Sequence, residues 1–128
     1  MQVMAENPRH WLTIYRCDTG GMHVVLENTN IGMSSEQFLV LNSNVQKALT
    51  HIESAESIPS CISIHYESTT IAIKSDPFKD IAKTFDNAAA RMDLLMNKES
   101  NSQNTYCTQS VNEQIGHTHH ITPQVRLN

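Results

Sequence analysis

The sequence lacks the features that most quickly assign a chain to a common class. Its 128 residues include only four glycines and four prolines, which excludes collagen-like and glycine- or proline-rich chains. Nine Lys and Arg against thirteen Asp and Glu give a net charge of -4, so there is no basic excess to attract nucleic acid or an anionic membrane. No apolar run approaches the roughly 18 residues of a membrane-spanning helix. We therefore expect a small soluble protein with one domain.

Cysteines and catalytic motifs are also scarce. Cys17, Cys61 and Cys107 are odd in number and widely spaced, which is a poor basis for disulfide bonds. There is no C-x-x-C, G-x-S-x-G or H-E-x-x-H motif and no phosphate-binding glycine loop. Residues 1–10 lack the apolar segment of a secretory signal. These absences predict a cytoplasmic protein that is not an enzyme and uses no cofactor.

The composition changes near Met96. Half of residues 97–128 are Asn, Gln, Ser or Thr, and the few apolar residues among them are scattered. Such a segment cannot bury enough apolar surface to offset its loss of conformational entropy, so we expect a disordered tail. The expected organisation is a flexible N-terminus at 1–8, a single domain at 9–96 and the tail at 97–128.

An internal similarity appears when the chain is shifted by 40 residues. Residues 26–38 then align without a gap with residues 66–78, so that Glu27 matches Glu67 and Phe38 matches Phe78. The apolar positions stay in phase beyond this stretch. The pattern favours duplication of a unit, at about 22–52 and 62–95, over convergence of two segments on similar patterning.

Each unit is predicted to be a β-hairpin followed by a helix. Alternating apolar residues at 22–26 and 62–66 indicate half-buried strands, with turns expected at 28–29 and 68–69. The second turn would pair Tyr66 with Ile71. Apolar residues then recur every three or four positions, after cap candidates Ser34 or Ser35 in the first unit and Asp76 in the second.

A further strand is expected at 11–17. A three-residue loop at 19–21 would keep Leu12 and Ile14 on the buried face, place a glycine in the left-handed conformation and set Cys17 opposite His23. The predicted fold class is α+β, in the order βββαββα. An antiparallel sheet of about five strands would carry two helices on one face.

Two groups of residues are candidate metal ligands. Cys17 and His23 would lie together on the outward face of the sheet, and thiolate and imidazole are ligands that suit zinc. Cys61 and His65 share a strand but lie about 13 Å apart at the usual rise per residue, too far to bind one ion. His117, His119 and His120 in the tail form the second candidate group. Exposed polar side chains without a metal are the alternative in both cases.

The outward face of the sheet is the candidate interaction surface. Gly32 and Ala72 are small residues at equivalent positions, which would let another backbone approach closely. The residues predicted to form this surface are Tyr15, Val25, Gly32, His65 and Ala72. We expect a protein-interaction module that associates through this face. It would form a homo-oligomer such as a homodimer, or bind another protein. Binding of single-stranded nucleic acid on the open sheet is the alternative, and binding of a metal or small molecule is a second one.

Overall fold

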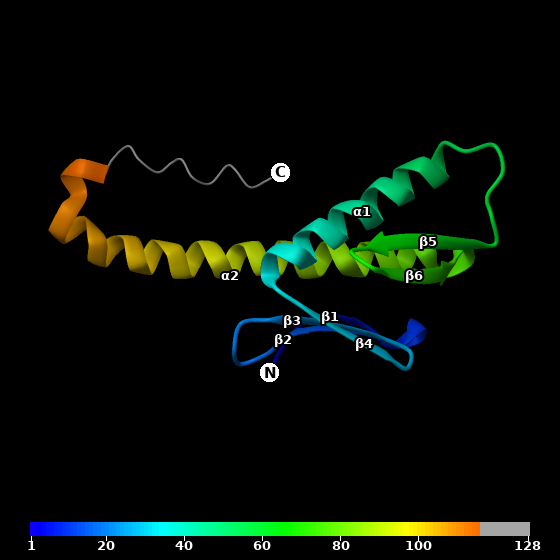
Figure 1. Ribbon diagram of the computed structural model, residues 1–128, viewed down its shortest axis with the longest axis horizontal. Helices are drawn as coiled ribbons and strands as arrows, with labels where there is room; N and C mark the ends of the chain where they lie inside the picture. Colours follow the sequence, from blue (N-terminus) through cyan, green and yellow to red (C-terminus); the bar gives the residue numbers. More distant parts are fainter. Residues whose placement is uncertain (116–128) are drawn as a thin grey trace. The chain divides into compact units, whose positions relative to one another are not determined.

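The computed structural model describes the backbone of residues 1–115 and the side chains of residues 1–98 (Figure 1). Residues Met1–Met92 form one compact unit, and a second unit begins at Asp93. Helix α2 (Ser75–Ile115) belongs to both units. In the described part of the chain, no helix is long and apolar enough to cross a membrane. The fold and the site below concern the first unit.

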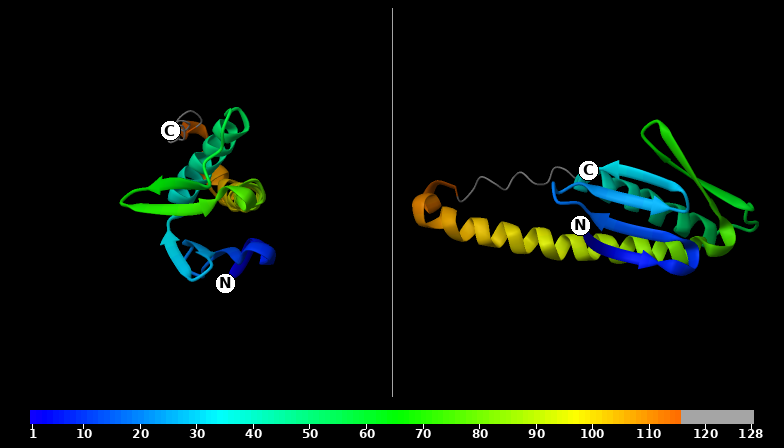
Figure 2. Two further views of the ribbon diagram at one scale, coloured as in Figure 1. Left: turned by 90° about the vertical axis from the view of Figure 1, so that its right-hand side faces the viewer. Right: turned by 90° about the horizontal axis from the view of Figure 1, so that it is seen from below.

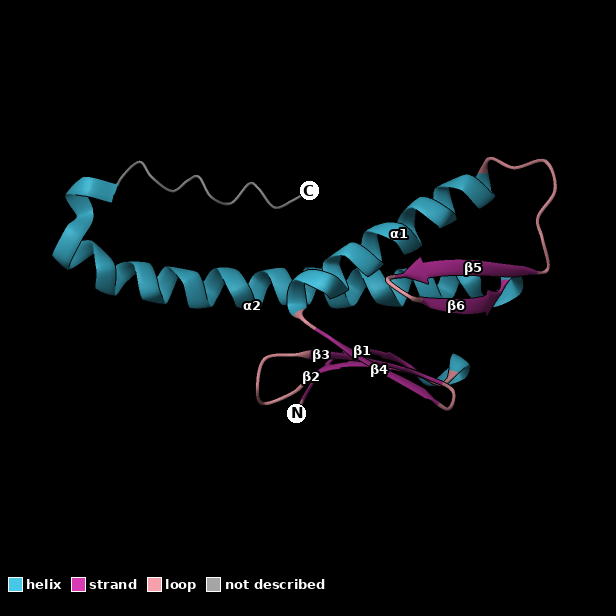
Figure 3. Ribbon diagram, in the orientation of Figure 1, coloured by secondary structure: helices cyan, strands magenta, loops and turns pink. Residues whose placement is uncertain are grey.

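The predicted α+β class is confirmed, but the strands form two antiparallel sheets instead of one (Figure 3). A four-stranded sheet has the order β1-β2-β3-β4, with strands Gln2–Asn7, Leu12–Arg16, Met22–Leu26 and Thr29–Met33. A separate hairpin pairs β5 (Cys61–Tyr66) with β6 (Thr69–Lys74). The strands number six instead of about five, and they are divided between two sheets instead of lying in one. Helix α1 (Ser35–Glu53) and the part of α2 within the first unit, up to Met92, lie on the same side of the four-stranded sheet (Figures 1 and 2).

The additional strand is β1, in the segment that we expected to be flexible. Met4 is buried at its centre, and the strand pairs with β2. The pairing shifts between Val3 and Ala5, as at a β-bulge. An extra residue in a strand interrupts the alternation of inward and outward side chains, which explains why the sequence pattern did not reveal it.

The loop between β2 and β3 differs from the prediction by a shift of two residues in strand pairing. His23 lies opposite Tyr15, and Arg16 lies opposite Met22, so the expected pairing of Cys17 with His23 is wrong. A shift of two preserves the face on which each side chain lies, and Leu12 and Ile14 are accordingly buried. Gly20 has the left-handed backbone expected of a glycine in this loop, with φ of 93°.

The two hairpin turns lie one residue earlier than predicted. The turn residues are Glu27-Asn28 and Glu67-Ser68, so Tyr66 pairs with Thr69 instead of Ile71. Glu27 and Glu67 have positive φ angles of 56° and 53°. A positive φ at the first turn residue is typical of type II′ hairpin turns, where glycine is the usual residue. The sequence has no glycine at either position, and the turns were therefore misplaced.

The elements recur at the same spacing of 40 residues that the sequence shows. Strand β6 begins 40 residues after β4, and α2 begins 40 residues after α1. Phe38 and Phe78 are both buried, with exposed fractions of 0% and 1%. These facts agree with equivalent hairpin–helix units, while the origin of the units by duplication stays a prediction.

Both helices begin directly after a hairpin, close to the predicted cap residues. Ser34 caps α1 in a capping box, in which its hydroxyl accepts from the Gln37 backbone and the Gln37 side chain accepts from the Ser34 backbone. Helix α2 begins at Ser75, one residue before the predicted cap Asp76. It continues to Ile115, past the change in composition near Met96. Residues 116–128, with the remainder of the predicted tail, lie outside the described residues.

The core of the first unit lies between the helices and the inward faces of the strands. Its largest fully buried side chains come from the four-stranded sheet and the two helices: Phe38, Phe78, Phe85, Leu12, Ile14, Met22, Leu41, Val24 and Val45. Phe38 of α1 and Phe85 of α2 stack with ring centroids 5.9 Å apart. This contact joins the two helices. Both rings are also buried from solvent, so the contact is part of the core.

Candidate functional site

The residues predicted to form one interaction surface are divided between the two sheets. Tyr15, Val25 and Gly32 belong to the four-stranded sheet, while the exposed residues His65 and Ala72 belong to the β5–β6 hairpin. No strand of one sheet pairs with a strand of the other within residues 1–115. The expected continuous five-stranded surface is therefore absent from this part of the chain.

Three residues of the four-stranded sheet do lie together. The rings of Tyr15 and His23 stack in parallel, with centroids 4.8 Å apart. Gly32 pairs with His23, and a Cβ atom at Gly32 would lie 3.3 Å from Cε1 of the His23 ring. The glycine thus leaves room for the histidine ring, which covers part of the strand that we expected to be open to a partner.

Cys17 has the most perturbed side chain of the predicted metal ligands. Its Sγ lies 3.0 Å from Oγ1 of Thr19. Hydrogen bonds from the Thr19 side chain and backbone, with smaller contributions from His23 and Gly21, lower the pKa of the Cys17 thiol to about 7. Hydrogen bonds favour the thiolate because they stabilise its negative charge.

The other predicted ligands do not complete a metal site with Cys17. His23 Nδ1 lies 3.1 Å from Oδ1 of Asn30, and His65 Nδ1 lies 3.1 Å from Oγ1 of Thr70. Among the described residues there is no group of three or more His, Cys, Asp or Glu side chains that could hold a metal ion. His117, His119 and His120 lie outside the described residues.

A groove that the sequence did not predict lies between the four-stranded sheet, β6 and α2. Its volume is about 520 Å³, and we call it the Trp11 groove. Most of its lining is apolar. The lining residues are Arg9, His10, Trp11, Val24, Leu26, Glu27, Thr29, Ile31, Cys61, Thr69, Thr70, Ile71, Ala72, Ile73, Lys74, Pro77, Ile81 and Phe85.

The groove exposes one strand of the hairpin along its edge. Every residue of β6 (Thr69–Lys74) lines it, although successive side chains of a strand point to opposite faces. Lining by all six residues indicates that the groove runs along the unpaired edge of the strand, not over one of its faces. In Figure 1, β6 is the strand of the hairpin on the side of the four-stranded sheet.

Trp11 is the one tryptophan of the chain, and it lies at this groove with 75% of its surface exposed. Its backbone is left-handed, with φ of 55°. Its N–H donates to the carbonyl of Pro8 at 3.2 Å, and its carbonyl accepts from the Glu27 N–H at 2.9 Å. A bulky residue in this conformation costs of order 1–3 kcal/mol and persists only where its surroundings enforce it. The backbone of this exposed indole is thus fixed.

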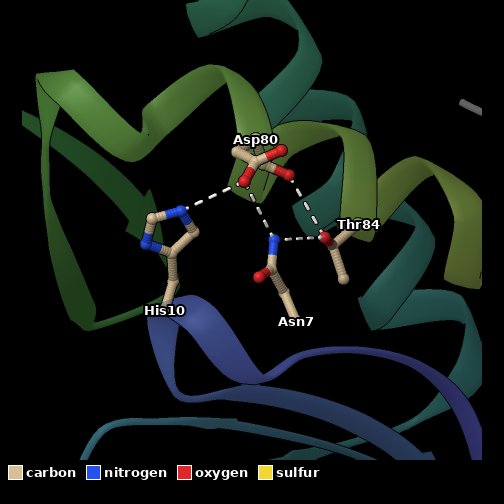
Figure 4. Close-up of polar contacts among 4 residues, drawn as sticks. All are labelled: Asn7, His10, Asp80 and Thr84. Carbon is tan, nitrogen blue, oxygen red and sulfur yellow. Dashed lines mark hydrogen bonds and ion pairs between the residues drawn. The ribbon is translucent and has the colours of Figure 1, made fainter.

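A polar cluster fixes the segment before Trp11 on α2 (Figure 4). The Asn7 side-chain amide donates to Oδ2 of Asp80 and to Oγ1 of Thr84, each at 3.3 Å. His10 Nε2 lies 3.1 Å from the same Asp80 oxygen. The Asn7 hydrogen bond, followed by His10 and Arg9, holds the pKa of Asp80 below its usual range. The cluster thereby positions the residue that follows His10, which is Trp11.

A second depression, of about 830 Å³, adjoins this cluster on the other side. Its charged lining consists of Arg9, Lys79 and Lys83 against Asp76, Asp80 and Asp86. Three cations and three anions leave no net charge to select a ligand. One of the cations, Lys79, already lies 3.8 Å from Glu53 in an exposed ion pair. The Trp11 groove is therefore the better candidate site.

Sequence reasoning missed the groove because its parts lie far apart in the chain. His10 and Asp80 are separated by 70 residues. The one available signal was the lone tryptophan at a strand boundary, three residues after Pro8. Comparison of the chain with protein-family models, with curated proteins and with solved structures found no match. Function is therefore inferred from geometry.

Proposed function

We propose that this protein is a non-enzymatic protein-interaction module that binds its partner in the Trp11 groove. The observation that carries the proposal is a tryptophan that is exposed and fixed in its backbone at the mouth of an apolar groove. Tryptophan is enriched among the residues that dominate binding energy at protein interfaces. Free Cys17 and Cys61 fit a reducing compartment, and we place the protein in the cytoplasm.

The rigidity around Trp11 supports this role. A residue whose position is set before binding loses little conformational entropy when the partner arrives. The Pro8 and Glu27 backbone bonds hold Trp11 itself, and the Asp80 cluster holds its neighbour His10. The groove beside it offers half-buried apolar side chains such as Leu26, Ile31 and Ile71. Burial of a partner's apolar groups there would supply the favourable free energy.

The test uses a random library of nine-residue peptides displayed on phage and selected on the wild-type protein. Binding of a selected, fluorescein-labelled peptide is then measured by fluorescence polarisation. Trp11→Ala should weaken binding at least about 30-fold, the effect of losing about 2 kcal/mol at a dominant residue. Ile58→Ala is the matched control, because Ile58 is also exposed, at 55%, and lies outside the groove. Equal binding by wild type and Trp11→Ala would contradict the proposal.

Self-association through the outward face of the four-stranded sheet is the second candidate. The observation that favours it is the position of Gly32, which has no side chain, beside the stacked Tyr15 and His23 rings. In this case Gly32→Glu should give a folded monomer in sedimentation equilibrium. Gly32→Ala controls for crowding of His23 by the new Cβ atom. A wild type that is monomeric at high micromolar concentration would contradict this candidate.

A further inference from the structure

We propose that the occupant of the Trp11 groove is an extended segment of a partner protein that pairs with the free edge of β6. The segment would become the third strand of the β5–β6 sheet. This proposal rests on the proposed function and adds the conformation and chemistry of the ligand. The starting observation is that the groove follows all six residues of β6 along an edge that pairs with no other strand of residues 1–115.

The strand register identifies the backbone groups that face the groove. Tyr66 and Thr69 flank a two-residue turn, and such flanking residues form a hydrogen-bonded pair. Because hydrogen-bonded and non-hydrogen-bonded pairs alternate, Ile71 also bonds to β5, while Thr70, Ala72 and Lys74 do not. The N–H and C=O groups of these three residues therefore point away from β5, toward the groove. They offer an extended peptide a ladder of backbone hydrogen bonds.

The walls of the groove set the side-chain pattern of the ligand. Side chains of an added strand alternate between two faces, as they do along β6 itself. On β6, Ile73 is buried and Ile71 is half-buried, so the same face of the added strand would meet the apolar wall. That wall includes Ile81 and Phe85 of α2. We expect apolar residues at every second position of the bound segment.

The charges of the groove favour an acidic segment. Arg9 and Lys74 line it against Glu27, which leaves one net positive charge in a protein with net charge -4. The predicted ligand therefore alternates apolar residues with polar or acidic ones. Opposite charges at the rim would also accelerate association at low salt.

A second copy of this chain is a poor fit to the same edge. Two-fold pairing would require the β6 edges of two copies to meet. The edge lies in a groove whose opposite wall is the chain's own four-stranded sheet, with Val24 and Ile31. A single extended segment enters such a groove more easily than a folded hairpin that carries its own sheet.

The experiment measures the selected peptide against variants of β6. Ala72→Pro removes an edge N–H without removing a bond to β5, and proline is tolerated on edge strands. We expect at least a tenfold loss of affinity. Ala72→Val, which keeps the N–H, should bind within about twofold of wild type. Gly32→Pro places the same change at the equivalent edge position of β4 and should also leave binding unchanged. Circular dichroism verifies that each variant is folded.

A scan of N-methylated peptides tests the same pairing on the wild-type protein, which keeps the test valid if Ala72→Pro does not fold. Methylation at alternate amides should abolish binding, and methylation at the amides between them should not. One outcome would overturn edge pairing and leave the proposed function intact. In it, Trp11→Ala weakens peptide binding, Ala72→Pro binds the peptide as tightly as wild type, and the scan shows no alternation. Equal binding by all variants would overturn both. A dimer that Ala72→Pro dissociates would overturn the choice of a partner segment over a second copy.

Discussion

Replacement of Glu27 by glycine should stabilise the protein. Glu27 has φ of 56°, and the left-handed conformation costs an L-residue roughly 1–2 kcal/mol relative to glycine. Glycine gives back about 0.5–1 kcal/mol through the larger entropy of the unfolded chain. The Glu27 N–H that donates to the Trp11 carbonyl is retained in the variant. The expected net gain is about 0.5–1 kcal/mol in the free energy of unfolding.

The equivalent change in the second hairpin should give a smaller gain. Glu67 has φ of 53°, but its Oε2 also accepts a hydrogen bond of 2.8 Å from the Gln37 side chain. Glu67→Gly loses this exposed bond, which contributes of order 0.5 kcal/mol or less at the surface. The comparison of the two variants therefore separates backbone strain from side-chain bonding.

Urea unfolding followed by circular dichroism measures both effects. The midpoint should rise for Glu27→Gly with an unchanged denaturant slope, and the melting temperature should rise by a few degrees. Glu27→Ala is the control, because alanine removes the carboxylate and keeps the strain. If Glu27→Gly is no more stable than Glu27→Ala, the left-handed turn inferred for this hairpin is wrong.

Three further predictions concern the core, the thiols and acid stability. Phe38→Ala and Phe78→Ala should each reduce the free energy of unfolding by about 3–5 kcal/mol, and a loss under about 1 kcal/mol for either would contradict its burial. Cys17 should react with iodoacetamide with a pH midpoint near 7, as peptide mass spectrometry can resolve, and Thr19→Val should raise that midpoint; an unchanged midpoint in the variant would contradict the Thr19 contacts. The pKa of Asp80 is lowered in the folded protein, so ionised Asp80 stabilises the fold. This contribution to the free energy of unfolding is complete above the ordinary carboxyl pKa and is lost as pH falls through the lowered pKa. Asp80→Asn should therefore flatten the acid limb of the stability curve in urea unfolding, and an unchanged limb would show that the cluster does not stabilise the fold.

The sequence predicted the faces of the strands better than their partners. Alternation placed Leu12 and Ile14 in the core, and helical spacing placed Phe38 there; all three are buried. Face assignment survives a register shift of two residues, so it stayed correct while the predicted partners of Cys17 and Tyr66 were wrong. The turns were misplaced because glutamate, not glycine, adopts the positive φ angle there.

The candidate site was beyond sequence reasoning for a different reason. Its walls come from residues that the pattern had already placed in a hydrophobic core, such as Val24, Ile81 and Phe85. These side chains are almost fully buried and still line a groove, because the strands form two separate sheets. Alternation within each strand does not determine how strands are divided between sheets. Hydrogen bonds from Asn7 and His10 to Asp80 likewise depend on tertiary contacts across the chain.

Intrinsic fluorescence of Trp11 tests the central claim most directly, since the chain contains one tryptophan. With 75% of its surface exposed, the indole should emit at the red end of the tryptophan range in the free protein. Titration with a selected peptide should shift the emission to shorter wavelengths and protect it from iodide quenching, with the same affinity that fluorescence polarisation gives. A peptide that binds while the emission and quenching of Trp11 stay unchanged would show that binding occurs elsewhere and would contradict the assignment of the groove.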